Sequence, residues 1–188
     1  MMSNFVKFTD EKLGETYFYT KHSSGLDIYV FPKKMTHKTA FLGTKFGSFY
    51  EKGAECDGVV KNYSSGIAHF LEHKLFSSED GVDAISKLAE IGADANAYTT
   101  TNKTVYMFSC TDNFYQSLAG LIDFVYHPYF TDDSVEREKG IITQEIRMFA
   151  DSPYDSVTQN LLKAMYGDCV ISRDVCGSEE SISKITAK

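Results

Sequence analysis

The chain has 188 residues, of which 43% are hydrophobic and 14% aromatic, and its formal net charge is −7. This length and hydrophobic content allow one domain with its own core and exclude an intrinsically disordered tail. With 26 acidic and 19 basic residues, the composition argues against a nucleic-acid partner, which would require a basic stripe on the surface. The sequence shows no signal peptide and no apolar run of about 18 residues, so we expect no membrane contact and a cytoplasmic location.

Strands dominate the first half of the chain and helices dominate the second half. Strands are predicted where aromatic and β-branched residues gather between turn-forming residues, and helices where a capping residue precedes a periodic apolar pattern. This order predicts the α+β class, with a mostly antiparallel sheet packed against several helices in a single unit, 1–188. The predicted elements, in chain order, are strands over 15–19, 26–31 and 39–50, a loop over 51–65, helices from about 66 and over 82–91, strands over 94–99 and 104–109, and helices over 112–125, 132–150, 153–166 and 179–186.

The first long helix, which Ser64 or Ser65 is expected to cap, contains a pattern of metal-binding residue types. His69 and His73 are four residues apart, so they lie one above the other on one helical face and can direct both imidazoles at one point. Glu72 borders the same point. Two neutral imidazoles with a nearby carboxylate are typical of a zinc site that activates water. The alternative is a chance pattern in a structural domain that binds no metal.

A catalytic zinc takes three protein ligands and keeps a fourth position open, so a third ligand is expected on another element. The helix over 132–150 offers Glu138 and Glu145, which at about 100° per residue fall in the middle of its apolar side. A buried, unpaired carboxylate costs on the order of several kcal/mol, so an acid at this place indicates a cationic partner. The alternative is a rotated helix in which both acids meet water. The apolar side comprises Val135, Ile141, Ile142, Ile146, Met148 and Phe149.

These residues resemble a known family. A His-x-x-Glu-His segment with a distal Glu is similar to the inverted zinc motif of the pitrilysin/insulinase metallopeptidases. Further segments resemble blocks of the bacterial zinc-protease members of that family. They are Gly25-Leu26, Lys45-Phe46-Gly47-Ser48, Gly66-Ile67-Ala68, Asn96-Ala97-Tyr98-Thr99, Tyr129-Phe130, Glu136-Arg137-Glu138 and Gln144-Glu145-Ile146.

The resemblance implies a role for each residue of the site. His69, His73 and Glu145 would be the ligands of one Zn²⁺, and Glu72 would be the general base that activates a zinc-bound water. Glu138 would hydrogen-bond a liganding histidine and fix its orientation. The implied activity is that of a zinc-dependent endopeptidase. The alternatives are a non-catalytic subunit that binds zinc or peptides, and an inactive fragment.

The resemblance also implies a substrate and a partner. Asn96 and Ala97 would pair with an extended peptide, which adds a strand to the sheet. Family members consist of two or more homologous α+β units that close on the substrate, so this chain is expected to be one incomplete N-terminal unit of a longer protein. The Arg and Tyr that the opposite unit usually contributes have no counterpart here. Cys169 and Cys176 match no common zinc-ribbon spacing and receive no role.

Overall fold

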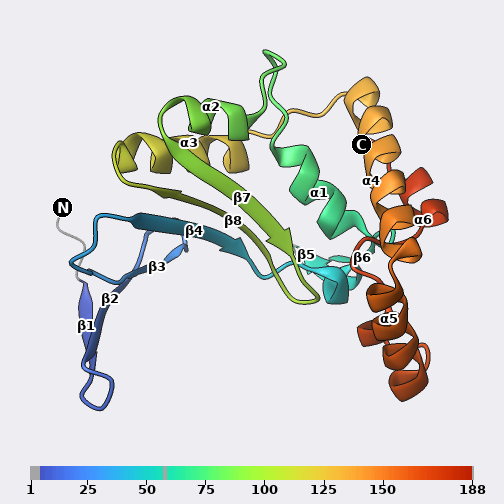
Figure 1. Cartoon of the computed structure of the whole chain (residues 1–188), viewed down its shortest axis with the longest axis horizontal. Helices are drawn as coiled ribbons and strands as arrows, with labels where there is room; N and C mark the ends of the chain where they lie inside the picture. The colour runs from blue at the N-terminus through green and yellow to red at the C-terminus, as the bar shows by residue number, and fades with distance from the viewer. Residues whose placement is uncertain (1–4, 57–58, 188) are drawn as a thin grey trace. The chain divides into compact units, whose positions relative to one another are not determined.

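The computed structural model describes residues 5–56 and 59–187 (Figure 1). Its contacts divide the chain into two compact units, one that ends at Thr36 and one that begins at His37. The paired strands of both units are antiparallel and accompany several helices, which confirms the predicted α+β class. None of the helices within the described ranges is long and apolar enough to cross a membrane.

The first unit is a three-stranded sheet of order β1-β2-β3. Its strands are β1 (Val6–Asp10), β2 (Glu15–Lys21) and β3 (Asp27–Val30). Rings on neighbouring strands stack, and the ring centroids of Phe8 and Tyr17 lie 5.0 Å apart. The two predicted strands and the turn between them are confirmed, whereas β1 is a strand that the sequence analysis did not predict.

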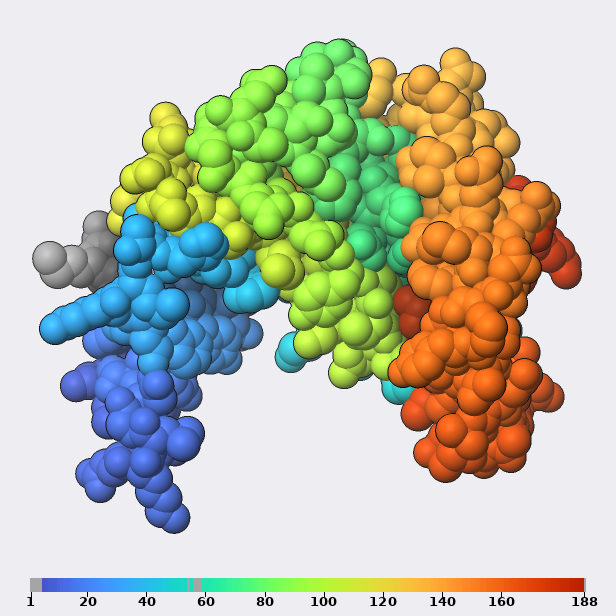
Figure 2. All heavy atoms as spheres, in the orientation of Figure 1, coloured from blue at the N-terminus to red at the C-terminus, as the bar shows by residue number. Residues whose placement is uncertain are grey.

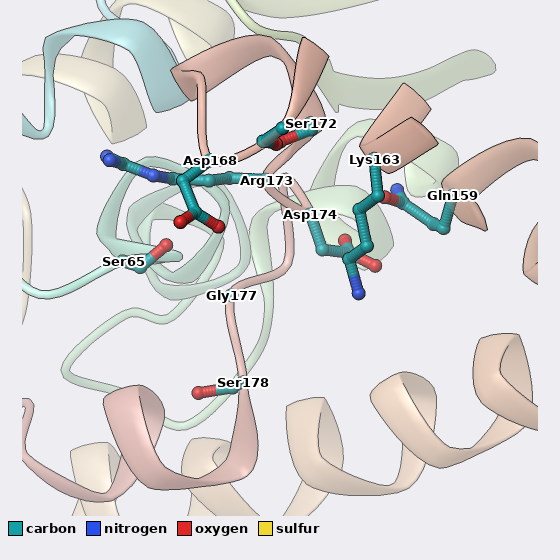
Figure 3. A pocket seen from close by; sticks show the side chains of 10 residues that line it. Ser65, Gln159, Lys163, Asp168, Ser172, Arg173, Asp174, Gly177 and Ser178 are labelled. Carbon is teal, nitrogen blue, oxygen red and sulfur yellow. The ribbon is translucent and has the colours of Figure 1, made fainter. Parts of the chain in front are cut away.

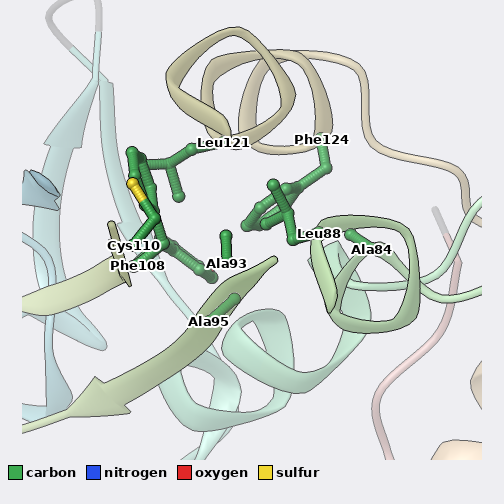
Figure 4. Close-up of a cluster of buried hydrophobic side chains, with 9 residues drawn as sticks. Ala84, Leu88, Ala93, Ala95, Phe108, Cys110, Leu121 and Phe124 are labelled. Carbon is green, nitrogen blue, oxygen red and sulfur yellow. The ribbon is translucent and has the colours of Figure 1, made fainter. Parts of the chain in front are cut away.

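The second unit is built on a sheet of order β4-β8-β7, which comprises β4 (Lys38–Thr44), β8 (Thr104–Cys110) and β7 (Ala93–Thr99). Helix α2 (Ala84–Glu90) packs on β7 and α3 (Phe114–Tyr126) packs on β8. Alternate residues of the strands point into the core that the sheet shares with these helices (Figure 4). The buried members of this core are Ala84, Leu88, Ala93, Ala95, Tyr106, Phe108, Cys110, Leu121 and Phe124.

The predicted strand over 39–50 is longer than the strand in the structure. It ends at Thr44 and is followed by a short 3-10 helix, Ser48–Tyr50. Gly47 lies at the break, where a Cβ atom would come within 2.3 Å of the carbonyl oxygen of Thr100. The absence of a side chain at Gly47 lets these two backbone segments approach each other closely.

The loop predicted over 51–65 is wrong, because the segment contains a hairpin of β5 (Lys52–Cys56) and β6 (Val59–Asn62). All four residues of β6 are exposed, among them Val59 at 55% and Val60 at 65%, so β6 has no buried face. A strand without a buried face leaves no apolar alternation in the sequence, which explains why the pattern failed to indicate it.

Four helices complete the second unit: α1 (Ile67–Leu75), α4 (Asp132–Asp151), α5 (Pro153–Tyr166) and α6 (Glu179–Ser183). They agree with the predicted helices, although α6 is shorter than expected. No residue of α5 is buried, and its side chains stand on the surface in orange in Figure 2. Helices α1, α4 and α6 share a second core cluster with the segment that follows α6. Its buried members are Phe70, Val135, Ile142, Ile182 and Ile185.

Candidate metal centre

Helix α1 lies between the sheet and α4, because it contacts β7, β8 and α4 (Figure 1). His69 and Glu72 are each 8% exposed, and His73 is half-buried. The ring centroids of His69 and His73 lie 4.6 Å apart. The two imidazoles therefore stand side by side on one helical face, as their spacing of four residues predicts.

A buried carboxylate from the preceding hairpin region caps the start of α1. Glu51 Oε1 accepts hydrogen bonds from the backbone N–H groups of Gly66, at 3.0 Å, and Ala68, at 3.3 Å. The predicted cap by Ser64 or Ser65 is wrong, because the N-cap residue is Gly66 and it has no side-chain cap. A negative charge at this end of the helix interacts favourably with the helix dipole. Glu51 thus fixes the first turn of the helix that carries the histidines.

Helix α4 brings two acids to the face of α1 that carries the histidines. Glu145 Oε2 lies 3.4 Å from His73 Nε2 and 3.7 Å from His69 Nε2. Glu138 Oε1 lies 3.1 Å from His73 Nδ1, within hydrogen-bond distance. The side chains of Glu138 and Glu145 are 14% and 25% exposed. The structure therefore brings together the two histidines and both acids that the sequence singled out.

The apolar side of α4 is narrower than the sequence analysis expected. Val135 and Ile142 are buried, but Ile141 and Met148 are 55% and 60% exposed, so their predicted burial is wrong. The side of α4 that is buried is the one that packs on α1 and α6. Glu138 and Glu145 are found where this buried side meets the exposed one, rather than in the middle of an apolar side.

The two histidines differ in proton affinity. Burial, together with the neighbouring His73, lowers the pKa of His69 to about 4. The hydrogen bond to Glu138 raises the pKa of His73, against the opposing effect of burial. His69 is therefore neutral near pH 7, and a neutral imidazole is the form that binds metal ions.

Glu72 is held by a strand of the sheet. The hydroxyl of Thr99, on β7, donates a hydrogen bond of 2.6 Å to Glu72 Oε2. Burial raises the pKa of Glu72, whereas the hydrogen bond from Thr99 lowers it. The carboxylate thus combines a fixed position with a raised affinity for a proton, which are two properties of a general base.

Asn96 and Ala97 lie on β7. Asn96 is exposed and Ala97 is half-buried, and they pair with Met107 and Tyr106 of β8. Within the described residues, β7 is an outer strand of its sheet. The backbone N–H of Ala97 donates to the side-chain Oδ1 of Asn96 at 2.8 Å.

Cys176 lies beside this cluster, although its sequence position gave it no role. Its Sγ atom, a ring nitrogen of His69 and a carboxylate oxygen of Glu145 all lie within 4.8 Å of one another. Cys176 is 8% exposed, and burial raises the pKa of its thiol. The spacing of Cys176 from the other residues carries no periodic signal, so only the folded chain reveals this neighbour.

The donor set of this cluster fits a divalent zinc ion. Imidazole nitrogens and carboxylate oxygens are common zinc ligands, and here they meet in a partly buried place. The Nδ1 atom of His69 is buried without a hydrogen-bond partner in the part of the chain that the structure describes. The Nε2 atom of the same ring faces the Glu145 carboxylate, and an uncharged imidazole nitrogen beside a carboxylate is an arrangement that a bound cation would satisfy.

A cavity of about 600 Å³ among the described residues lies elsewhere (Figure 3). It is not lined by any residue of the cluster, which comprises His69, His73, Glu138 and Glu145. The charged residues around it are two cations, Lys163 and Arg173, and two anions, Asp168 and Asp174. Because the charges are of both signs, they favour no particular ligand.

Comparison with known proteins identifies the family. The sequence model described as Insulinase (Peptidase family M16) matches residues 39–178. The chain therefore belongs to the insulinase family of peptidases, M16. A Bacillus subtilis relative named "Uncharacterized zinc protease YmfH" is 45% identical over 178 residues, which cover 94% of this chain and 41% of that protein.

Solved structures share the fold of this chain. A protein from Alicyclobacillus acidocaldarius described as an M16-like peptidase matches with a TM-score of 0.85 and 34% identity, over 99% of this chain and 41% of that one. Pitrilysin matches in fold alone, with a TM-score of 0.71 and 17% identity, over 97% of this chain and 20% of its own. The family resemblance seen in the sequence is confirmed. The chain spans less than half the length of these relatives.

Proposed function

We propose that this chain is the zinc-binding unit of a metalloendopeptidase that hydrolyses extended peptides. The observation that supports it most is the approach of Glu145 Oε2, from α4, to the Nε2 atoms of both histidines of α1, at 3.7 and 3.4 Å. Two imidazoles and one carboxylate form the ligand set of known hydrolytic zinc sites. Family membership and the zinc-protease name of the B. subtilis relative also support the proposal.

Each residue of the cluster has one task in this proposal. His69, His73 and Glu145 hold one Zn²⁺, and Glu138 orients the ring of His73 through Nδ1. When bound, Zn²⁺ lowers the pKa of a water molecule and polarises the substrate carbonyl. Glu72 accepts the proton of the attacking water and later delivers it to the leaving amine.

The substrate proposal rests on β7. Strand β7 pairs with β8 on one side, and the described residues supply no strand on the other side. An extended peptide can add to such an edge through backbone hydrogen bonds, which bind largely without regard to the peptide sequence. In this arrangement Asn96 and Ala97 contact the peptide backbone, and a substrate carbonyl replaces Asn96 Oδ1 as the acceptor for the Ala97 N–H.

The remaining partner is a second homologous unit. The chain covers 41% of the B. subtilis relative, so the rest of a protein of that length has room for such a unit. We propose that this unit, in the same or a partner chain, closes over the peptide.

The test is the substitution Glu72→Gln in the complete protein. Glutamine keeps the size and the hydrogen bond from Thr99 but cannot accept the proton, so zinc content should stay unchanged. The rate of peptide hydrolysis should fall at least about a hundredfold, the usual scale of a lost general base. Metal analysis and a peptide-cleavage assay measure the two quantities.

The matched control is Glu79→Gln, because Glu79 is an exposed acid shortly after α1. Its rate should equal that of the parent protein. If Glu72→Gln cleaves peptides at the parental rate, Glu72 is not the base. A parent protein that holds zinc but cleaves no peptide would instead support the non-catalytic subunit. A zinc content near zero after gentle purification would indicate a structural domain.

A further inference from the structure

Cys176 lies next to two of the three proposed zinc ligands, His69 and Glu145. Its Sγ, a ring nitrogen of His69 and a carboxylate oxygen of Glu145 lie within 4.8 Å of one another. Atoms that share one tetrahedral zinc ion, with bonds of about 2.0–2.3 Å, are themselves roughly 3.5 Å apart. Rotation of the side chains by a small amount is therefore enough to place all three on one ion.

The backbone holds Cys176 against the start of α1. A Cβ atom on Gly66 would lie 2.4 Å from the Cys176 carbonyl oxygen, and one on Gly177 would lie 2.5 Å from the carbonyl oxygen of Ser65. Both glycines have a positive φ, +87° and +77°, which is costly for other residues. Cys176 is thus tied to the same helix that carries His69 and His73.

His69 lies beside Cys176 and turns its Nε2 atom toward the carboxylate of Glu145, at 3.7 Å. The residue is 8% exposed, and its Nδ1 atom is buried without a hydrogen-bond partner among the residues that the structure describes. Cys110 shows the contrasting case of a structural thiol, because it is buried within the apolar core between the sheet and α3. Both cysteines are buried, so burial alone does not distinguish Cys176 from a structural thiol. Its neighbours His69 and Glu145 do.

We propose that the Cys176 thiolate is a fourth protein ligand of the metal ion held by His69, His73 and Glu145. This inference rests on the zinc site of the proposed function. A lone pair of Sγ forms the bond to the metal, and the thiol proton is released to water, without oxidation or reduction. Thiolates are strong ligands of zinc and of other borderline-soft cations.

A fourth protein ligand changes the state of the site. Structural zinc sites are closed by four protein ligands, whereas catalytic sites keep one position for water or substrate. With Cys176 bound, the site is in a closed, resting form. Water or a substrate carbonyl must displace the thiolate before hydrolysis begins.

The test uses Co²⁺ as a spectroscopic substitute for zinc in the full chain. A thiolate ligand gives Co²⁺ an intense charge-transfer band in the near ultraviolet, while any bound Co²⁺ gives weaker bands in the visible range. We expect both kinds of band in the parent protein. Cys176→Ser should lose the charge-transfer band and keep the visible bands. Cys169→Ser is the matched control and should keep both, because Cys169 is a free, exposed thiol.

The outcomes separate this inference from the proposed function. Visible bands without a charge-transfer band in the parent protein would overturn the role of Cys176 and leave the zinc site standing. A charge-transfer band that persists in Cys176→Ser would assign the thiolate to another cysteine. Parent protein that binds no Co²⁺ and no Zn²⁺ would overturn both proposals.

A second measurement needs no variant and covers the case in which Cys176→Ser fails to fold. X-ray absorption of the zinc-loaded parent protein should show a sulfur scatterer at about 2.3 Å from zinc. A shell of nitrogen and oxygen atoms alone would overturn the inference.

Discussion

Three titratable residues of α1 are neighbours in space and yet differ in proton affinity. Burial lowers the pKa of His69 to about 4, while the hydrogen bond to Glu138 raises the pKa of His73. Burial also raises the pKa of Glu72. The same desolvation thus keeps the imidazole of His69 uncharged and makes the carboxylate of Glu72 a better proton acceptor, because it disfavours the charged form of each group.

The substitution Thr99→Val should shift the pH dependence of peptide hydrolysis. The Thr99 hydroxyl stabilises ionised Glu72, so its loss raises the pKa of Glu72. A general base must be deprotonated, so the acidic limb of kcat/KM should move to higher pH. One hydrogen bond to a charged group is worth about 1.5 kcal/mol, which corresponds to roughly one pH unit.

The measurement is the pH profile of kcat/KM for the complete protein. Thr39→Val, an exposed threonine of β4, serves as the control and should leave the profile unchanged. An acidic limb of Thr99→Val that coincides with that of the parent protein would contradict the role of Glu72 as the base.

At the scale of elements, the start of α1 depends on residues from three other places in the chain. Glu51, before the hairpin, binds the backbone N–H groups of Gly66 and Ala68. Ile182 of α6 and the carbonyl of Cys176 occupy the space where a side chain on Gly66 would stand. The helix that carries His69 and His73 is therefore positioned by tertiary contacts rather than by its own capping residue.

Glu51→Ala should destabilise the fold, because it leaves the N–H groups of Gly66 and Ala68 without their acceptor in a buried place. The expected loss in the free energy of unfolding is about 2 kcal/mol, measured by urea denaturation. Glu55→Ala removes an exposed acid from the adjacent hairpin and should change the free energy by no more than about 0.5 kcal/mol. Equal effects of the two substitutions would show that the cap contributes little.

At the scale of the whole molecule, the candidate site joins α1 and α4, which are separated by the sheet strands β7 and β8 and by α2 and α3 along the chain. The proposed ligands come from both helices, and Cys176 comes from the segment before α6. A metal ion that binds them would cross-link distant parts of the second unit. Metal binding should therefore be coupled to global stability.

Zinc removal should lower the thermal midpoint of this unit. At a free zinc concentration of a hundred times Kd, binding stabilises the native state by about 2.7 kcal/mol. For a domain of this size, that free energy corresponds to roughly 5–10 °C. Scanning calorimetry with zinc and with a chelator measures the shift. Glu145→Gln should abolish most of the zinc-dependent shift. A thermal midpoint of the parent protein that does not change with zinc would refute a site that spans α1 and α4.

Features that depend on neighbours along the chain could be predicted from the sequence. The spacing of His69 and His73 places both rings on one helical face whatever surrounds the helix, and aromatic and β-branched residues between turn-forming residues indicated β7 and β8. The prediction of Glu145 used an apolar side of α4 that is wider than the real one, because Ile141 and Met148 are exposed. Periodicity singled out the two acids that lie beside the histidines but not the exact side of the helix that packs on α1.

The sequence by itself determined the class of fold, the family and the helix that carries the paired histidines, since these follow from local periodicity and from recognisable motifs. Only the tertiary structure revealed the hairpin after Glu51, the Glu51 cap of α1 and the approach of Cys176 to His69 and Glu145. The physical reason is that each of these contacts joins segments that are distant along the chain. Local sequence sets which surfaces a segment offers, whereas the packing of the whole unit decides which of them meet.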